Sequence, residues 1–156
     1  MSSFSSRSCR RFSFFRSSRG FSLIELMVVI VIMSIISTIA IPSYQASIKK
    51  GYRTEAMAAL TELSQAMERF HAETFTYLGA ANMSANTGPP SSTLYPTTSI
   101  PRAGDVVAYR ITIHAATYNT YTLRATPENA QLKDPCGTLS INHIGIRTAA
   151  ISNGCW

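Results

Sequence analysis

Charged residues, cysteine and tryptophan are scarce in this sequence of 156 residues. Only 14% of the residues are charged, against about 25% in typical soluble proteins. There are three cysteines, none of them in a CxxC pair, which excludes a disulfide-rich scaffold. With 46% hydrophobic residues the chain is also too apolar to be intrinsically disordered, and its length accommodates one domain.

Catalytic and metal-binding patterns are missing as well. His71, His114 and His143 are scattered without His-x-His or HExxH spacing, so each is expected to be an ordinary surface or hydrogen-bonded histidine. The sequence has no Ser/His/Asp context, no glycine-rich phosphate loop and no acidic cluster suited to Mg²⁺ or Ca²⁺. We therefore expect no catalytic residues, no metal, no cofactor and no enzymatic activity.

The basic residues that are present concentrate at the N-terminus. The formal net charge is +6, and residues 1–20 carry five arginines and no acid. Residues 21–156 hold the other nine basic residues and all eight acids, so their net charge is only +1. The basic isoelectric point therefore reflects a short N-terminal segment and does not by itself predict a nucleic-acid partner.

A long apolar run follows directly. Residues 21–41 contain one charge, Glu25, and read FSLIELMVVIVIMSIISTIAI. As a helix they would extend about 31 Å, so we predict a membrane-spanning helix rather than a buried core helix. The preceding arginines place its N-terminal end in the cytoplasm and the rest of the chain outside it. Pro42-Ser43-Tyr44 follows the run in place of a small-residue cleavage site, which argues against an ordinary secretory signal.

The junction between the basic and apolar segments has a specific motif. The residues from Arg19 to Tyr44 read RGFSLIELMVVIVIMSIISTIAIPSY, and they closely resemble the N-terminus of type IV prepilins. The resemblance implies that residues 1–20 are a leader, that prepilin peptidase cleaves between Gly20 and Phe21, and that the amine of Phe21 is then methylated. It also implies assembly from the bacterial inner membrane into an extracellular pilus. The implied partners are other pilin subunits and the inner-membrane assembly machinery.

Glu25 is unusual within the apolar run. A carboxylate at mid-depth in a membrane helix costs about 2.5–3.5 kcal/mol, and such residues tend to be functional. Glu25 lies one turn from the implied new N-terminus, and its natural partner is the amine of Phe21, in the same chain or in a neighbouring subunit. The second arrangement would make residues 21–42 a filament-assembly element with a defined register. A carboxylate that only reaches the membrane surface is the plainer alternative.

Pro42 marks the end of the transmembrane segment. It lacks an N–H group and clashes with the preceding turn, so we predict a kink or a local break of the helix there. In the prepilin family, local unwinding ahead of this proline is associated with assembly, and a glycine commonly assists it. This sequence has no glycine between Phe21 and Pro42, and Ser34, Ser37 and Thr38 lie there instead.

Residues 43–156 are predicted to form an extracytoplasmic head with an α+β fold. Residues 43–76 continue the helix, and their apolar positions recur at helical spacing on one face that we expect to pack on a sheet. Residues 77–105 form a long connection rich in glycine and proline. The apolar face of the helix carries Leu60, Leu63, Met67 and Phe70.

Four strands are predicted, over residues 106–113, 118–125, 137–141 and 144–149. A turn at His114–Thr117 joins the first two, Pro127 ends the second strand, and Asn142 and Gly145 are turn residues in the last hairpin. A four-stranded antiparallel sheet over the amphipathic half of the helix is the economical arrangement, because it gives each apolar face a partner. This arrangement is also the type IV pilin fold that the N-terminal resemblance implies.

The cysteines fit this topology. Cys9 lies in the leader, so the mature chain keeps Cys136 and Cys155. If the head is extracytoplasmic, a disulfide between them is expected, whereas a metal site or two free buried thiols are the alternatives. The bond would close a loop of about 20 residues, which is worth roughly 3 kcal/mol. The ending DPCGTL…GCW resembles that of minor pilins in particular.

We therefore predict a structural subunit of a type IV pilus, and favour a minor pilin that supports assembly. Twitching motility, adhesion and DNA uptake are the downstream roles. The alternatives are a major pilin, an adhesin or DNA-uptake receptor pilin, and a type II secretion pseudopilin, although pseudopilins usually lack the disulfide loop. DNA is weakly supported as a partner, because residues 77–156 carry five basic and three acidic residues, short of a clustered phosphate-binding patch.

Overall fold

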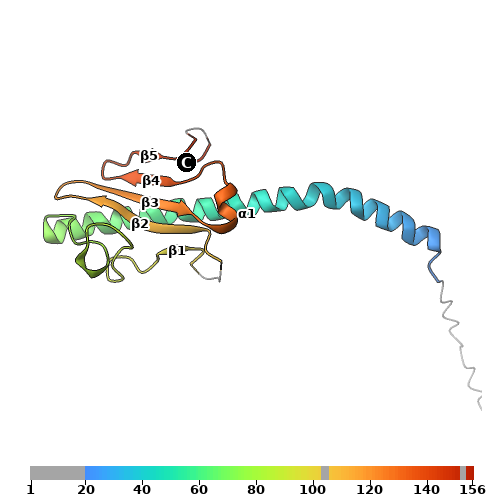
Figure 1. Cartoon of the computed structure of the whole chain (residues 1–156), viewed down its shortest axis with the longest axis horizontal. Helices are drawn as coiled ribbons and strands as arrows, with labels where there is room; N and C mark the ends of the chain where they lie inside the picture. The colour runs from blue at the N-terminus through green and yellow to red at the C-terminus, as the bar shows by residue number, and fades with distance from the viewer. Residues whose placement is uncertain (1–19, 103–105, 152–153) are drawn as a thin grey trace, which may run out of the picture. The chain divides into compact units, whose positions relative to one another are not determined.

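The structure is a computed structural model that describes residues 20–102, 106–151 and 154–156. Within these ranges the chain forms one long helix, α1 (Leu23–Thr74), two short 3₁₀ helices and five strands (Figure 1). It divides into two units, Met1–Ala40 and Ile41–Trp156, and α1 contributes to both. The shorter elements are η1 (Asn82–Ser84), β1 (Ser99–Ile100), β2 (Tyr109–Ala116), β3 (Tyr121–Pro127), η2 (Asn129–Lys133), β4 (Leu139–Asn142) and β5 (Arg147–Thr148).

The predicted long helix is confirmed, and its start follows the predicted junction closely. Of the predicted leader only Gly20 is described, and Cys9 lies outside the described residues. The helix continues through Pro42 without a break, so the predicted break is wrong, while the kink remains a prediction. One proline removes one backbone hydrogen bond, and α1 is continuous on either side of Pro42.

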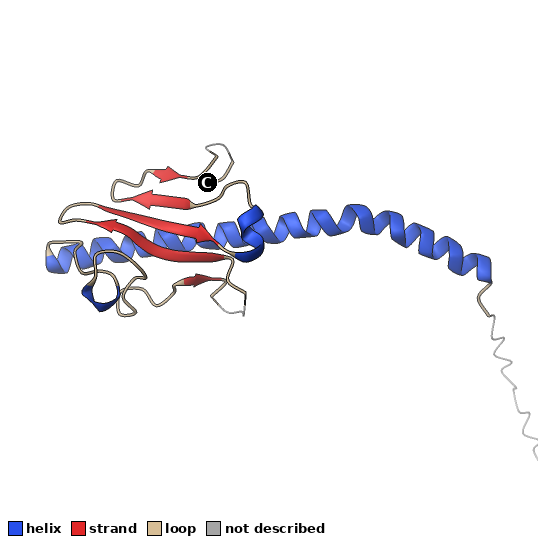
Figure 2. Cartoon of the chain, viewed as in Figure 1, coloured by secondary structure: helices blue, strands red, loops and turns tan. Residues whose placement is uncertain are grey.

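The sheet has five antiparallel strands in the order β1-β2-β3-β4-β5, one more than predicted (Figure 2). The additional strand, β1, lies in the segment predicted to be a connection. It pairs with β2 through Ser99 opposite Arg110 and Ile100 opposite Tyr109. Two residues are too few to show the alternation by which strands are recognised in a sequence. The α+β arrangement itself is as predicted.

The first hairpin turns later than predicted. A bulge at His114 shifts the pairing between Ile113 and Ala115, so β2 extends to Ala116 and the alternating pattern breaks before the strand ends. The turn lies at Thr117–Thr120, where the backbone N–H of Thr120 donates to the Thr117 hydroxyl oxygen at 3.0 Å. Pro127 ends β3, as predicted.

The second hairpin also has a longer turn than predicted, so β5 is reduced to two residues. The side-chain oxygen of Asn142 accepts the backbone N–H groups of Ile144 and Ile146, at 3.2 and 2.8 Å. Gly145 adopts a φ of 78° in this turn, a conformation that favours glycine. Asn142 and Gly145 are thus turn residues, as predicted.

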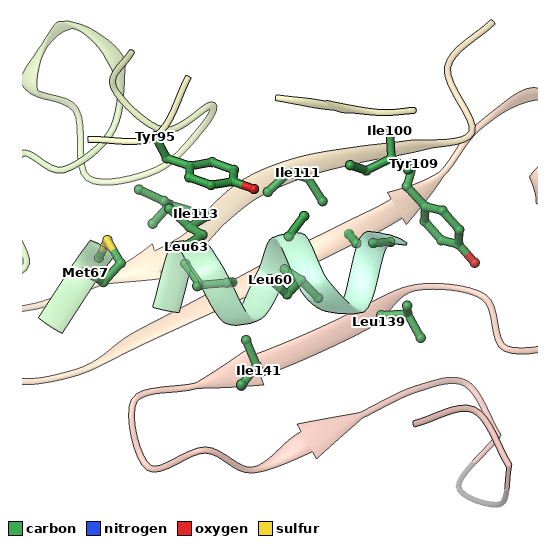
Figure 3. Packing of buried hydrophobic residues seen from close by; sticks show 14 of the residues in the cluster. Leu60, Leu63, Met67, Tyr95, Ile100, Tyr109, Ile111, Ile113, Leu139 and Ile141 are labelled. Atoms are coloured by element: carbon green, nitrogen blue, oxygen red, sulfur yellow. The ribbon is translucent and has the colours of Figure 1, made fainter. Parts of the chain in front are cut away.

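The hydrophobic core lies between the second half of α1 and the inner face of the sheet (Figure 3). The predicted helical stripe supplies Leu60, Leu63 and Met67, which are fully buried, whereas Phe70 is only partly buried at the edge of the cluster. Burial of a leucine side chain stabilises a fold by about 1.5–3 kcal/mol. The sheet side of the core is formed by Ile100, Tyr109, Ile111, Ile113, Leu123, Leu139 and Ile141.

Candidate functional site

The first candidate site is the N-terminal segment that contains Phe21 and Glu25. The carbonyl of Ser22 accepts the backbone N–H groups of Glu25 and Leu26, at 3.0 and 3.2 Å, so α1 begins two residues after Phe21. Glu25 consequently lies in the first turn of α1. A carboxylate there is favoured by the positive end of the helix dipole, close to where a new amine at Phe21 would be.

The apolar residues of this segment are exposed. Every residue from Gly20 to Ala40 is exposed, and Phe21 is 78% exposed. The most apolar window of α1 has a mean hydropathy of 2.7 and no buried residue. Contiguous apolar surface of this extent marks a membrane-embedded or protein-bound segment. The first part of α1 is therefore the candidate membrane span and assembly surface.

Three hydroxyl groups within the apolar segment are satisfied by the helix itself. Ser34, Ser37 and Thr38 donate to backbone carbonyl groups three or four residues earlier, each at 2.7 Å. Internal hydrogen bonds of this kind let polar side chains enter a hydrocarbon environment at little cost. These residues are therefore compatible with the membrane span.

The second candidate site is the head, which is held together by a buried polar network around Asp134. The Asp134 carboxylate is fully buried and forms a bidentate ion pair with Arg53 of α1. It also accepts the Tyr109 hydroxyl at 2.8 Å, the Gln131 side-chain amide at 2.9 Å and the backbone N–H of Cys136 at 3.1 Å. The network thus joins α1, β2, η2 and the disulfide at one point.

The pKa values in this network follow from burial and from its hydrogen bonds. Burial by itself raises the pKa of Asp134, but the bonds from Arg53, Tyr109 and the Cys136 N–H outweigh it and lower that pKa below its ordinary value. Burial raises the pKa of Tyr109 to about 12. At neutral pH the carboxylate is therefore charged and the phenol is protonated.

A second cluster of polar and aromatic side chains lies further along α1, around Glu68. Glu68 of α1 accepts the hydroxyl groups of Tyr77 and Tyr121, each at 2.9 Å. The two phenol rings pack edge to face, 4.8 Å between centroids, and His71 stacks on Tyr77 at 4.3 Å. Burial is the main cause that raises the pKa of both tyrosines, to about 12 for Tyr77. His71, one of the three histidines predicted to be ordinary surface or hydrogen-bonded residues, thus stacks on an aromatic ring.

The disulfide between Cys136 and Cys155 is present, as predicted. It attaches the C-terminus to the segment between η2 and β4. Gly137, with a φ of 56°, follows the first cysteine, and a Cβ there would lie 3.0 Å from the Cβ of Ala150. The second hairpin and the C-terminus are therefore closely packed beside the bond.

The outer surface of this hairpin carries cationic and hydroxyl groups. A shallow cavity of about 380 Å³ is lined by Arg124, Thr138, Ser140 and Thr148. The Arg147 guanidinium lies 5.3 Å from the centroid of the Trp156 ring, whose Nε1 donates to the Thr148 carbonyl at 2.9 Å. Among the described residues, neither arginine forms an ion pair with an acid. Arginine and hydroxyl groups are the side chains that commonly contact phosphates.

The predicted site residues thus fall into two groups. Gly20, Phe21 and Glu25 are adjacent at the start of α1, whereas Cys136 and Cys155 are joined in the head. Sequence reasoning missed the network around Asp134, because its charged partner Arg53 lies 81 residues away and its phenol partner Tyr109 lies 25 residues away. It also missed the association of Arg147 with Trp156, for which the sequence offers no signal.

Two family models match this chain, one at the N-terminal segment and one over most of the head. The family model described as "Prokaryotic N-terminal methylation motif" matches residues 15–41, which include Gly20, Phe21 and Glu25. The model described as "Type IV minor pilin ComP, DNA uptake sequence receptor" matches residues 42–140, which is most of the head. The chain belongs to this ComP family of type IV minor pilins. The predicted prepilin resemblance is confirmed.

Two proteins and one solved structure are similar to this chain. The type IV major fimbrial protein FimA of Dichelobacter nodosus is 32% identical over 111 residues, which cover 67% of this pilin and 69% of FimA. The type II secretion system core protein G of Klebsiella michiganensis is 32% identical over 62 residues, which cover 40% of this pilin and 44% of protein G. A solved type IV pilin of Shewanella oneidensis is 26% identical, with a TM-score of 0.46 over 69% of this chain and 97% of that chain.

The pilin is a structural subunit of a type IV pilus and assembles with other pilin subunits. Its apolar N-terminal helix, which carries the methylation motif, anchors it in the inner membrane before it enters an extracellular filament. The α+β pilin fold predicted from the sequence is confirmed, with five strands in place of four.

Proposed function

We propose that this pilin is a minor pilus subunit that binds DNA during its uptake. The observation that carries the proposal is the match of the ComP DNA-uptake receptor family to residues 42–140 of the head. Charge composition alone gives DNA little support, since residues 77–156 carry a net charge of only +2. What supports DNA binding locally is the position of Arg124 and Arg147 beside the disulfide-linked hairpin.

The subunit reaches the pilus by the route that its N-terminus indicates. Prepilin peptidase removes residues 1–20, methylates Phe21, and leaves an amine just ahead of the first turn of α1. Glu25 of one subunit then pairs with the Phe21 amine of its neighbour, and the inner-membrane assembly machinery adds the subunit to the filament. This pairing is favoured because a carboxylate in an apolar helix needs a cationic partner.

The proposed DNA contact is tested by salt-dependent retention of duplex DNA on the immobilised full chain. Removing one cation that contacts a phosphate reduces the magnitude of the slope of log affinity against log salt by about 0.9. We expect Arg124→Gln and Arg147→Gln each to reduce the slope by that amount. Arg110→Gln is the matched control, because Arg110 is exposed on the sheet but is already paired with Glu128. Retention that is absent, independent of salt, or equally reduced by the control would contradict DNA binding through this surface.

A major pilin is the second candidate, because FimA is itself a major fimbrial protein. The two roles differ in copy number. Quantitative mass spectrometry of sheared filaments should find traces of a minor pilin, whereas abundant copies would identify a major pilin.

A further inference from the structure

Two neighbouring cavities open at the start of the head. One, of about 370 Å³, lies between the first turns of α1 after Pro42, residues 106–108 and η2. The other, of about 360 Å³, extends from Pro42 to Pro135. Lys49 and Lys133 line both cavities. Figure 2 shows η2, the short helix after β3, lying against α1 here, and the Gln131 amide bonds the Lys49 carbonyl at 3.1 Å.

The residues around these cavities combine exposed apolar side chains with cations. We define the base patch as four residues that line the cavities, Ile48, Lys49, Val106 and Lys133, together with Tyr44, which lies one helical turn before Ile48 on α1. Tyr44 and Val106 are 69% and 64% exposed, and Ile48 is also exposed. The one acid among the described residues that line the cavities is buried within its network with Arg53 and Tyr109. The two lysines therefore carry a local positive charge.

The base patch lies directly after the membrane span in the chain. Tyr44 is three residues beyond Ile41, the last residue of the apolar run, and Lys49 is eight residues beyond it. At 1.5 Å per helical residue these positions are about 4.5 and 12 Å from the end of the run. The polar headgroup layer is about 5–8 Å thick on each side of a bilayer. Tyr44 thus falls at the interface, and Lys49 reaches back to the headgroups along its flexible stem.

We propose that the base patch binds anionic phospholipid headgroups of the inner membrane while the subunit waits to be assembled. Tyrosine is enriched at membrane interfaces, and lysines near an anionic surface each contribute to binding. Lys49 and Lys133 come from elements far apart in the sequence and converge on the same two cavities. The lipid contact would hold the head on the bilayer until neighbouring subunits replace the lipid. It rests on the membrane anchor and is independent of the proposed DNA binding.

The test is hydrogen–deuterium exchange of the full processed chain in single-copy nanodiscs. Discs of phosphatidylcholine alone are compared with discs that also contain phosphatidylglycerol. We expect backbone amides of residues 44–53 and 129–135 to exchange more slowly in the anionic discs. Each lysine should contribute about fivefold, so Lys133→Gln should lower the added protection about fivefold and Lys49→Gln/Lys133→Gln should abolish most of it.

The control is Arg69→Gln, an equal change of charge on an exposed helical residue that lines neither cavity. It should keep the added protection. The proposal is overturned if protection is equal in the two lipids, or if the lysine variants retain it. It is also overturned if inorganic phosphate produces the protection in neutral discs, since the site would then bind a free anion. Protection that appears only with two copies per disc would identify a second subunit as the occupant and would equally overturn it.

Discussion

The two parts of α1 differ in how much of their apolar surface is exposed. From Gly20 to Ala40 every residue is exposed, most of them apolar. From Ala56 to Met67 the same helix buries its apolar face in the head. The exposed apolar surface of the first part fits lipid or other subunits as its partners. The second part is stabilised by packing in the core of the head. Changes in the two parts should therefore affect assembly and folding separately.

The largest effect is expected at the junction that controls processing. Gly20→Val should prevent the proposed cleavage, because it removes the glycine that precedes Phe21 in the prepilin-like motif, and the precursor should remain in the membrane with no filament incorporation. Intact-mass analysis of the membrane fraction measures this. Gly51→Val is the matched control, since a Cβ at Gly51 meets no atom within 4 Å. A mature chain beginning at Phe21 in the Gly20→Val variant would show that the cleavage assignment is wrong.

Glu25 should affect assembly without affecting the head. Removing one partner of a buried ion pair costs about 3 kcal/mol or more. Glu25→Gln should therefore insert normally but enter filaments about a hundredfold less at equilibrium, as counted by mass spectrometry of sheared pili. Glu73→Gln is a control on an exposed part of α1. Normal incorporation of the Glu25→Gln chain would contradict a pairing role between subunits.

The same comparison explains what could be predicted from the sequence. The apolar run, the junction at Gly20 and the stripe of Leu60 and Leu63 are local patterns, so they were predictable. The ion pair of Arg53 with Asp134 joins residues 81 positions apart and has no local signal. Strand β1 is too short to show alternation, and the bulge at His114 displaces the predicted turn.

Within the head, a change to the Asp134 network should lower the free energy of unfolding and leave membrane insertion unchanged. Asp134→Asn removes the charge that pairs with Arg53, and breaking a buried pair in this way costs about 3 kcal/mol. Urea unfolding of the detergent-solubilised chain, followed by circular dichroism, measures the loss of unfolding free energy. Glu128→Gln is the control, because its pair with Arg110 is largely exposed and exposed pairs are worth about 0–1 kcal/mol. Equal losses in the two variants would show that burial of Asp134 is unimportant.

The smallest effect is the acid dependence of stability that this carboxylate produces. Its pKa is lowered in the folded chain, so below the ordinary aspartate pKa of about 3.9 the unfolded chain binds the proton first. The stabilisation from Asp134 is therefore complete above that pH and is lost as the pH falls through the lowered pKa. Unfolding free energies measured across this range should fall less steeply in Asp134→Asn than in the unmodified chain. The apolar part of α1 up to Ala40 contains no ionisable residue except Glu25, so the difference reports on the head. Parallel pH profiles of the two chains would mean that the bonds from Arg53 and Tyr109 do not hold the carboxylate in its charged form.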